Sequence, residues 1–459
     1  MKQLFFGNFG VTFLQYTKWP HGDRNGWDLL QNQPYQPEAE MNIAQMAGKL
    51  RDRINDFSGE LSKNFCKTEK RFIHEMIYGI QARQSVRLSE IARSLNEDIR
   101  LKKTIDRLSS RLSRPGMAEE ITESVIRHGK NRIKENTLLI VDPTDITKKY
   151  AEKMQYLARV RDGSDKVIGN GYWMVEVIAA ETGERDVVPL YQSLYSQKAP
   201  DFESENAEVL NAIHRVSRHT GDAGIWVIDR GGDRGKILGP LLKNGRKFII
   251  RMRGDRHVLF RGKRRSMEEV AQACPLVYAD RVVKETKGKE EAYSLEYGYR
   301  KIKLPEYEKP LYLLVIKGFG VKPLILLTPI ALRKKRSLLW WVLESYLTRW
   351  RIEETIRFIK QSYQLEDVRV LTYERLKNMM ALVLAAVHFA AVYLGRRPKL
   401  EIMAVHIMRA AKRIFGIPDF RFYALADGIG KILDRADKGP YKKRILPQKG
   451  PQQLSLFET

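Results

Sequence analysis

Four polar residues in the segment S-Y-L-T-R-W-R-I-E-E-T-I-R-F-I-K share one face of a predicted helix. Tyr346, Arg349, Glu353 and Lys360 follow one another at intervals of three, four and seven residues. At about 100° per residue, their side chains fall within about 60° of one another. One carboxylate among two cations and a phenol suits a metal-ion ligand with phosphate-binding groups beside it.

Two further carboxylates follow apolar runs earlier in the chain. Asp142 follows L-L-I-V and Asp229 follows I-W-V-I, so each is predicted to end a buried strand. With Glu353 they form the minimal set of three carboxylates for two-metal phosphoryl transfer. Asp145 is a nearby alternative to Asp142, and Pro143 also makes Asp142 a good turn residue.

Neighbouring residues help to choose among the carboxylates. Glu354 lies about 140° from Arg349 around the predicted helix, so it leaves the shared face, whereas Glu353 stays on it. The apolar flank that would dock this helix on a sheet consists of Ile352, Ile356 and Ile359. Asp233 is predicted to cap the helix that follows Asp229, which favours Asp229 as the ligand.

The order of predicted elements indicates an α/β fold. Strands are expected at 137–141, 172–179, 186–191, 225–228 and 248–252, and helices at 204–217 and 236–242. Three strands followed by helix, strand, helix and strand is the order of a ribonuclease H-like fold. The first and fourth strands are neighbours in that order, which would bring Asp142 and Asp229 together.

Composition points to a nucleic-acid partner. Lys and Arg number 81 against 55 Asp and Glu, a net charge of +26 over 459 residues. Such an excess is typical of proteins that bind nucleic acid. We expect neither a signal peptide nor an apolar run of 18 residues, and therefore no membrane partner. Two distant cysteines, Cys66 and Cys274, argue against a disulfide framework or a zinc site and predict a reducing compartment such as the cytoplasm.

We expect seven regions along the chain. They are an N-terminal arm at 1–60, a helical DNA-binding domain at 61–135, the first part of the core at 136–255, a β-rich insertion at 256–320, the second part of the core with the carboxylate helix at 321–372, a C-terminal helical region at 373–435 and a basic flexible tail at 436–459. The helical domain, with Ser89 as a predicted N-cap and a basic helix at 99–112, resembles a helix-turn-helix module. A charged helical bundle is the alternative.

The chain resembles the DDE transposases of bacterial insertion sequences. The resemblance is to the branch marked by Y-x2-R-x3-E-x6-K, which the chain matches from Tyr346 to Lys360, and it covers roughly residues 60–395. It implies a ribonuclease H-like core with a β-strand insertion before the Glu. It also implies that two Mg²⁺ ions, with Mn²⁺ as a substitute, are held by Asp142, Asp229 and Glu353. The phosphates near the transposon terminus would be gripped by Tyr346, Arg349 and Lys360.

The implied activity is cleavage at the inverted repeats of an insertion sequence and joining of the ends to target DNA, by a homodimer on paired ends. A DNA-binding regulator with an unused site, or a structure-specific nuclease of the same fold, are the alternatives. Relatives that cut through a DNA hairpin stack a flipped base on a Trp of the insertion, but this chain has no Trp between Trp226 and Trp340. The aromatic residues that could replace it are Tyr293, Tyr297, Tyr299 and Phe319.

A second motif lies in the tail. It consists of Gln453, Leu454, Ser455, Leu456 and Phe457 after a basic stretch. It resembles the pentapeptide by which bacterial proteins dock onto the DNA polymerase sliding clamp, with Leu and Phe filling an apolar pocket. A chance apolar segment, or one that folds back on the core, is the alternative.

Overall fold

The computed structural model describes residues 12–14, 43–163, 167–184, 186–286, 289–394, 422–436 and 439–441. The tail motif at Gln453–Phe457 lies outside the described residues, as does most of the predicted N-terminal arm.

The first described helices form a compact helical part of the molecule. They are α2 (Ile43–Leu61), α3 (Lys67–Arg83), α4 (Leu88–Ser94), α5 (Leu101–Arg111) and α6 (Met117–Gly129), followed by the short η1 (Lys130–Arg132). Two sequence expectations were wrong here. Residues 43–60 belong to α2 rather than to a loosely organised arm, and α4 begins after Arg87, so Ser89 does not cap it.

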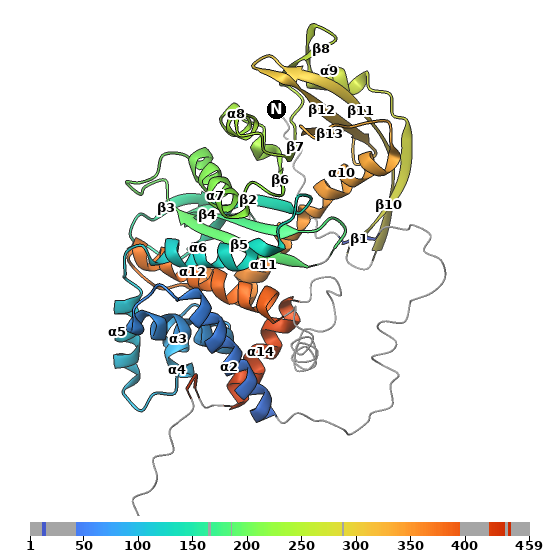
Figure 1. The fold of residues 1–459 in the computed structure, drawn as a ribbon. Helices are drawn as coiled ribbons and strands as arrows, with labels where there is room; N and C mark the ends of the chain where they lie inside the picture. Colours follow the sequence, from blue (N-terminus) through green and yellow to red (C-terminus); the bar gives the residue numbers. More distant parts are fainter. Residues whose placement is uncertain are drawn as a thin grey trace, which may run out of the picture.

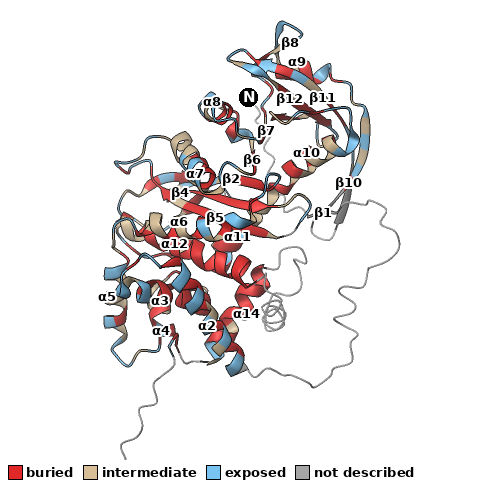
Figure 2. Cartoon of the chain, viewed as in Figure 1, coloured by how far each residue is buried: buried red, intermediate tan, exposed pale blue. Residues whose placement is uncertain are grey.

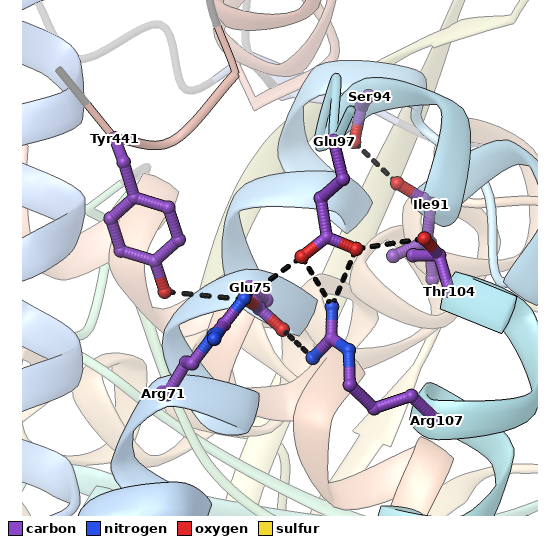
Figure 3. Close-up of polar contacts among 8 residues, drawn as sticks. All are labelled: Arg71, Glu75, Ile91, Ser94, Glu97, Thr104, Arg107 and Tyr441. Carbon is purple, nitrogen blue, oxygen red and sulfur yellow. Dashed lines mark hydrogen bonds and ion pairs between the residues drawn. The ribbon is translucent and has the colours of Figure 1, made fainter. Parts of the chain in front are cut away.

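A cluster of ion pairs fixes α3 against α5 (Figure 3). Glu75 of α3 is fully buried and accepts hydrogen bonds from Arg71 Nε at 2.7 Å and Arg107 Nη1 at 2.5 Å. Glu97, in the turn before α5, accepts from Arg71 Nη2 at 2.8 Å and Arg107 Nη2 at 2.9 Å. The Tyr441 hydroxyl lies 3.4 Å from Glu75 Oε1. Since two carboxylates share two guanidinium groups, the angle between the helices is firmly set.

The next elements build the centre of a mixed sheet. Its strands are β2 (Leu138–Thr147), β3 (Ala158–Arg161), β4 (Ile168–Ala180), β5 (Val187–Tyr195), β6 (Ile225–Ile228) and β7 (Phe248–Arg251), with α7 (Glu205–Thr220), η2 (Arg230–Gly232) and α8 (Gly235–Lys243) between them. Strands β5, β4 and β2 are antiparallel neighbours, and β2, β6 and β7 run parallel. The predicted contact between the first and fourth main strands is confirmed by the β2–β6 pair.

The predicted β-rich insertion is continuous with this sheet. It comprises β8 (His257–Phe260), β9 (Lys263–Ser266), α9 (Met267–Gln272), β10 (Tyr278–Thr286), β11 (Lys289–Leu304) and β12 (Tyr307–Lys317). Strand β13 (Leu324–Thr328) joins it to the core because it pairs with β12 on one side and β7 on the other. Strand β1 (Thr12–Leu14) pairs with β10.

The predicted carboxylate helix is broken in two. The segments are α10 (Arg336–Thr348) and α11 (Trp350–Ser362), which meet at Arg349. At this junction Arg349 N bonds to Tyr346 O and Ile352 N to Arg349 O, three residues apart rather than four. This tighter turn is of the 3₁₀ type and interrupts the α-helix. The remaining elements are η3 (Leu365–Asp367), α12 (Tyr373–His388), the π-helical η4 (Phe389–Tyr393) and α14 (Phe422–Ala436).

Helices cover both faces of the core sheet. Helix α7 lies over one face, and α6 and α12 lie against the other (Figure 1). The segment Tyr373–Tyr393 has the length and hydropathy of a membrane span, contrary to the sequence expectation, but 94% of its apolar 18-residue stretch is buried inside the molecule. Figure 2 shows the same helix as an almost continuous buried element. It is the central core helix between the sheet and the N-terminal helices.

Candidate active site

The two predicted aspartates lie side by side on neighbouring strands. Ile140 pairs with Val227 in the parallel β2–β6 ladder. Two residues farther along, Asp142 lies within β2 and Asp229 directly follows β6, so the same register places them at one level. The sequence suggested that Asp142 ends its strand, but β2 continues to Thr147 in its ladder with β4. It lies instead just past the point where the pairing with β6 stops.

Arg349 joins two of the three carboxylates. Its Nη1 lies 3.3 Å from Asp142 Oδ2, and its Nη2 lies 2.8 Å from Glu353 Oε1. The side chain is 8% exposed, and its guanidinium also lies near the rings of Tyr346 and Trp350, at 6.0 and 5.6 Å. The structure therefore brings Asp142 and Glu353 together through a buried cation at the α10–α11 junction.

Asp229 has a hydrogen-bond donor and an ion-pair partner of its own. The Tyr346 hydroxyl donates to Asp229 Oδ1 at 2.8 Å, and Arg251 Nη1 lies 3.6 Å from the same oxygen. Tyr346 is 6% exposed, so its phenol is packed in the interior. Burial, followed by the charge of Asp229, raises the pKa of Tyr346. The phenol therefore remains a hydrogen-bond donor at neutral pH.

The alternative Asp145 has different partners. Lys360 Nζ lies 3.3 Å from Asp145 Oδ2 and 3.1 Å from Glu366 Oε1. Asp145 also accepts hydrogen bonds from the Thr147 hydroxyl at 3.0 Å and from Gly163 N at 3.2 Å. Its carboxylate thus anchors Lys360 and the strand end, and contacts none of Asp142, Asp229 and Glu353.

Glu354, the alternative to Glu353, points to a different partner. Its Oε2 accepts from Arg351 Nη1 at 2.9 Å within α11. The choice of Glu353 from the helical wheel thus agrees with its contacts, although the helix is broken at Arg349.

Asp233 does not cap α8, contrary to the sequence expectation. The residue before α8 is Arg234. Asp233 instead accepts hydrogen bonds from Arg253 N at 2.9 Å and Arg256 Nε at 2.8 Å. Its carboxylate is committed to the loop after β7, which leaves Asp229 as the carboxylate nearest β2.

Burial and neighbouring charges set the protonation of the three carboxylates. Burial raises the pKa of Asp142 to about 7 even though Arg349 acts in the opposite direction. Burial also raises the pKa of Glu353, against the opposing effect of Arg349. For Asp229, burial acts to raise the pKa, but Arg349 and Arg251 outweigh it and the net pKa is lowered. More positive charge would therefore stabilise the ionised form of Asp142 and Glu353.

Glu176 is a fourth acidic residue that the sequence reasoning missed. It lies directly opposite Asp142 in the β2–β4 ladder, is fully buried, and neither of its carboxyl oxygens has a hydrogen-bond partner. Burial, followed by the charge of Asp142, raises the pKa of Glu176 to about 8. A signal was present in the sequence, since Glu176 interrupts the apolar run W-M-V-E-V-I-A-A.

The donor chemistry of this site fits a magnesium ion. Asp142, Asp229 and Glu353 offer only carboxylate oxygens, which Mg²⁺ prefers. Among the described residues, no three His, Cys, Asp or Glu side chains converge closely enough to hold a metal ion in this conformation. Arg349 explains this, because its guanidinium lies between Asp142 and Glu353. The uncompensated Glu176 carboxyl beside Asp142 indicates that the site can accommodate more positive charge.

Comparison with known protein families shows which family this chain belongs to. The transposase DDE domain matches residues 133–389, more than half of the 459-residue chain. The chain belongs to this family. Family membership implies an enzyme that cleaves and joins DNA, and divalent metal ions are its normal cofactors. The matched region contains Asp142, Asp229, Glu353 and Arg349.

Other comparisons add little to the transposase assignment. No curated protein matches the chain. Among solved structures it is similar to a piggyBac transposase in a synaptic complex with hairpin DNA, at 11% identity and a TM-score of 0.37, over 92% of this chain and 87% of that one. A likeness at that level supports no argument about this transposase domain.

The insertion aromatics of this transposase domain lie mostly in packed positions. Tyr297 is fully buried, donates to Asp280 at 2.5 Å, and its ring centre lies 6.1 Å from that of Trp340. It therefore belongs to the core between the insertion sheet and α10, and is not a free stacking surface. Tyr293 and Phe319 pack against each other, with ring centres 6.0 Å apart.

Proposed function

We propose that this chain is a transposase of a bacterial insertion sequence, in the branch with the Y-x2-R-x3-E-x6-K signature. It cuts the ends of the element and joins them to target DNA through a ribonuclease H-like core. Two Mg²⁺ ions held by Asp142, Asp229 and Glu353 are the proposed cofactors. The family match and the arrangement of these carboxylates support the proposal.

One structural observation gives this proposal its main support. A single buried guanidinium, that of Arg349, contacts a carboxylate from β2 and a carboxylate from α11, and the neighbouring strand β6 delivers Asp229 at the same level. Arg349 thus joins two carboxylates from separate elements, and the third carboxylate, that of Asp229, lies beside them with partners of its own, Tyr346 and Arg251. An arrangement of this kind, at a sheet edge, matches the needs of phosphoryl transfer.

The protein residues have defined tasks in this scheme. Bound at the carboxylates, divalent ions would supply an activated water or 3′-hydroxyl and stabilise the departing oxygen. Arg349 neutralises Asp142 and Glu353 in the metal-free protein, and its planar guanidinium can exchange these partners for a DNA phosphate. Tyr346 orients Asp229 through its hydroxyl. Lys360, at the same end of the sheet, provides a second positive charge beside Asp145.

The helical part supplies a surface for sequence recognition. Helix α5 buries Thr104 and Leu108 and exposes Lys102, Lys103 and Arg111. The Glu75 and Glu97 ion pairs hold α5 in place against α3. We assign α3 to α5 to recognition of the inverted repeats, as a helix-turn-helix module. A homodimer on paired ends, and docking of Gln453–Phe457 on the sliding clamp, complete the proposal.

A cleavage and joining assay tests this function. The purified protein is incubated with Mg²⁺ and with DNA that flanks its own gene, and both strands are mapped at nucleotide resolution. We expect cuts at the inverted repeats and joined products in a target plasmid. Binding without any cut would favour the regulator, and cuts without joined products would favour the nuclease. Products that do not depend on a divalent ion would contradict the two-metal scheme.

A further inference from the structure

The hairpin formed by β8 and β9 carries a concentrated positive charge. Between His257 and Ser266 it contains Arg261, Lys263, Arg264 and Arg265 and no Asp or Glu. All four side chains are exposed. Within the described part of the chain, none of the four forms an ion pair with a carboxylate. Unlike Arg256, which is paired with Asp233, these cations remain available to an anionic partner.

The turn at the tip of this hairpin requires a backbone conformation that is unfavourable for Arg261. Phe260 pairs with Lys263, so Arg261 and Gly262 form a two-residue loop. Both have a positive φ, at 50° and 77°, as in a type I′ turn. Asn-Gly and Asp-Gly suit such a turn best, whereas Arg is strained there. An Arg in this strained conformation at an exposed tip suggests a use for its side chain.

The hairpin is rigidly attached despite its exposed position. Val258 is fully buried, and Leu259 pairs with Lys303 of β11. The ring of Phe260 packs against the guanidinium groups of Arg261 and Arg300, at 5.3 and 5.7 Å. The hairpin stands at the outer end of the insertion, away from β2 and α11 (Figure 1). The backbone that carries these cations is therefore anchored to the insertion, and it lies away from the elements that carry Asp142 and Glu353.

We propose that the β8–β9 hairpin binds the phosphate backbone of duplex DNA outside the active site, without reading its sequence. This inference rests on the proposed function for the choice of DNA as the partner. The basic row continues onto β11 through Lys301 and Lys303, which are also exposed. A two-stranded ribbon with cations at its tip has the dimensions to enter a DNA groove, and each phosphate neutralised releases a counterion.

The test measures binding of the full chain to a duplex of unrelated sequence over a range of salt concentrations, by fluorescence anisotropy. The variants are Arg261→Asn, a triple Lys263→Thr/Arg264→Thr/Arg265→Thr, and Lys317→Thr at the far end of β12 as a single-charge control. We expect Arg261→Asn and the triple variant to bind more weakly, with a salt slope lower by about 0.9 for each lost phosphate contact. The control should bind like the wild type.

Arg261→Asn also separates binding from folding. Asn-Gly favours the type I′ turn, so this variant should unfold at an equal or higher denaturant concentration while it binds DNA less tightly. Wild-type affinity and salt slope in both hairpin variants would overturn the inference. A wild-type protein that binds DNA but never cuts would remove the proposed function and leave this assignment standing.

Discussion

Asp142 and Glu176 are direct partners across the β2–β4 ladder, with Glu176 fully buried and without a hydrogen bond to either oxygen. The carboxyl of Asp142 in the candidate site thus lies next to a second carboxyl, that of Glu176. Such a pair is unfavourable while both are ionised, because like charges oppose each other in a buried setting. This relationship makes the stability of the metal-free protein sensitive to pH.

Replacement of Glu176 by Gln should remove part of that sensitivity. The folded pKa of about 8 lies above the value of 4.5 for a free Glu. Between these two pH values the folded state keeps a proton that the unfolded state has lost, so stability falls as the pH rises, by about 1.4 kcal/mol per pH unit. Urea unfolding of the metal-free protein from pH 5 to pH 8 should show a shallower decline for Glu176→Gln. Parallel declines in the two proteins would contradict the assignment.

Arg349→Ala should strongly destabilise the metal-free protein. It leaves Asp142 and Glu353 without their buried cation, and loss of one partner of a buried pair costs about 3–5 kcal/mol. Arg351→Ala is the matched control on the same helix, because Arg351 is 19% exposed and pairs, among the described residues, with Glu354 alone, whereas Arg349 is 8% exposed and contacts two carboxylates. It should destabilise the protein less than Arg349→Ala does. Chemical denaturation measures both, and equal losses would mean that Arg349 is an ordinary surface cation.

His74→Asn should alter the stability at acidic pH. Burial lowers the pKa of His74 to about 4, whereas an unfolded His protonates near 6.5. In this window the unfolded state binds the extra proton, so His74 makes the protein lose stability as the pH falls, by about 1.4 kcal/mol per pH unit. The variant should lose less between pH 6.5 and pH 4.5. The exposed His214→Asn variant should keep the wild-type slope, and the same change in both variants would refute the role of burial.

Much of the architecture could be predicted from the sequence because the core strands are short β-branched runs. I-W-V-I and L-L-I-V became β6 and β2, and their order along the chain predicted the β2–β6 contact that aligns Asp142 with Asp229. The helical wheel placed Glu353, rather than Glu354, on the face of Arg349. This placement holds in the structure because the interruption of the helix at Arg349 spans one residue and leaves the helical periodicity in place.

Other features were not predicted, for different reasons. The break at Arg349 has no Pro or Gly to mark it, since it arises from two three-residue hydrogen bonds at one junction. Glu176 interrupts an apolar run, but only the β2–β4 register shows that it lies opposite Asp142. Helix α2 was missed although a helical period was present in its buried residues, Met46, Leu50, Ile54, Phe57 and Leu61.

Glu353→Gln and Glu354→Gln provide the most direct test of the central claim. The two residues are adjacent on α11, but only Glu353 shares Arg349 with Asp142. In a Mg²⁺-dependent cleavage assay on the DNA flanking the gene, Glu353→Gln should lose more than about 100-fold in rate, beyond the loss typical of residues that merely support a ligand. Glu354→Gln should stay near the wild-type rate. Equal rates for the two variants, or a loss confined to Glu354→Gln, would contradict the assignment of Asp142, Asp229 and Glu353 as the catalytic carboxylates.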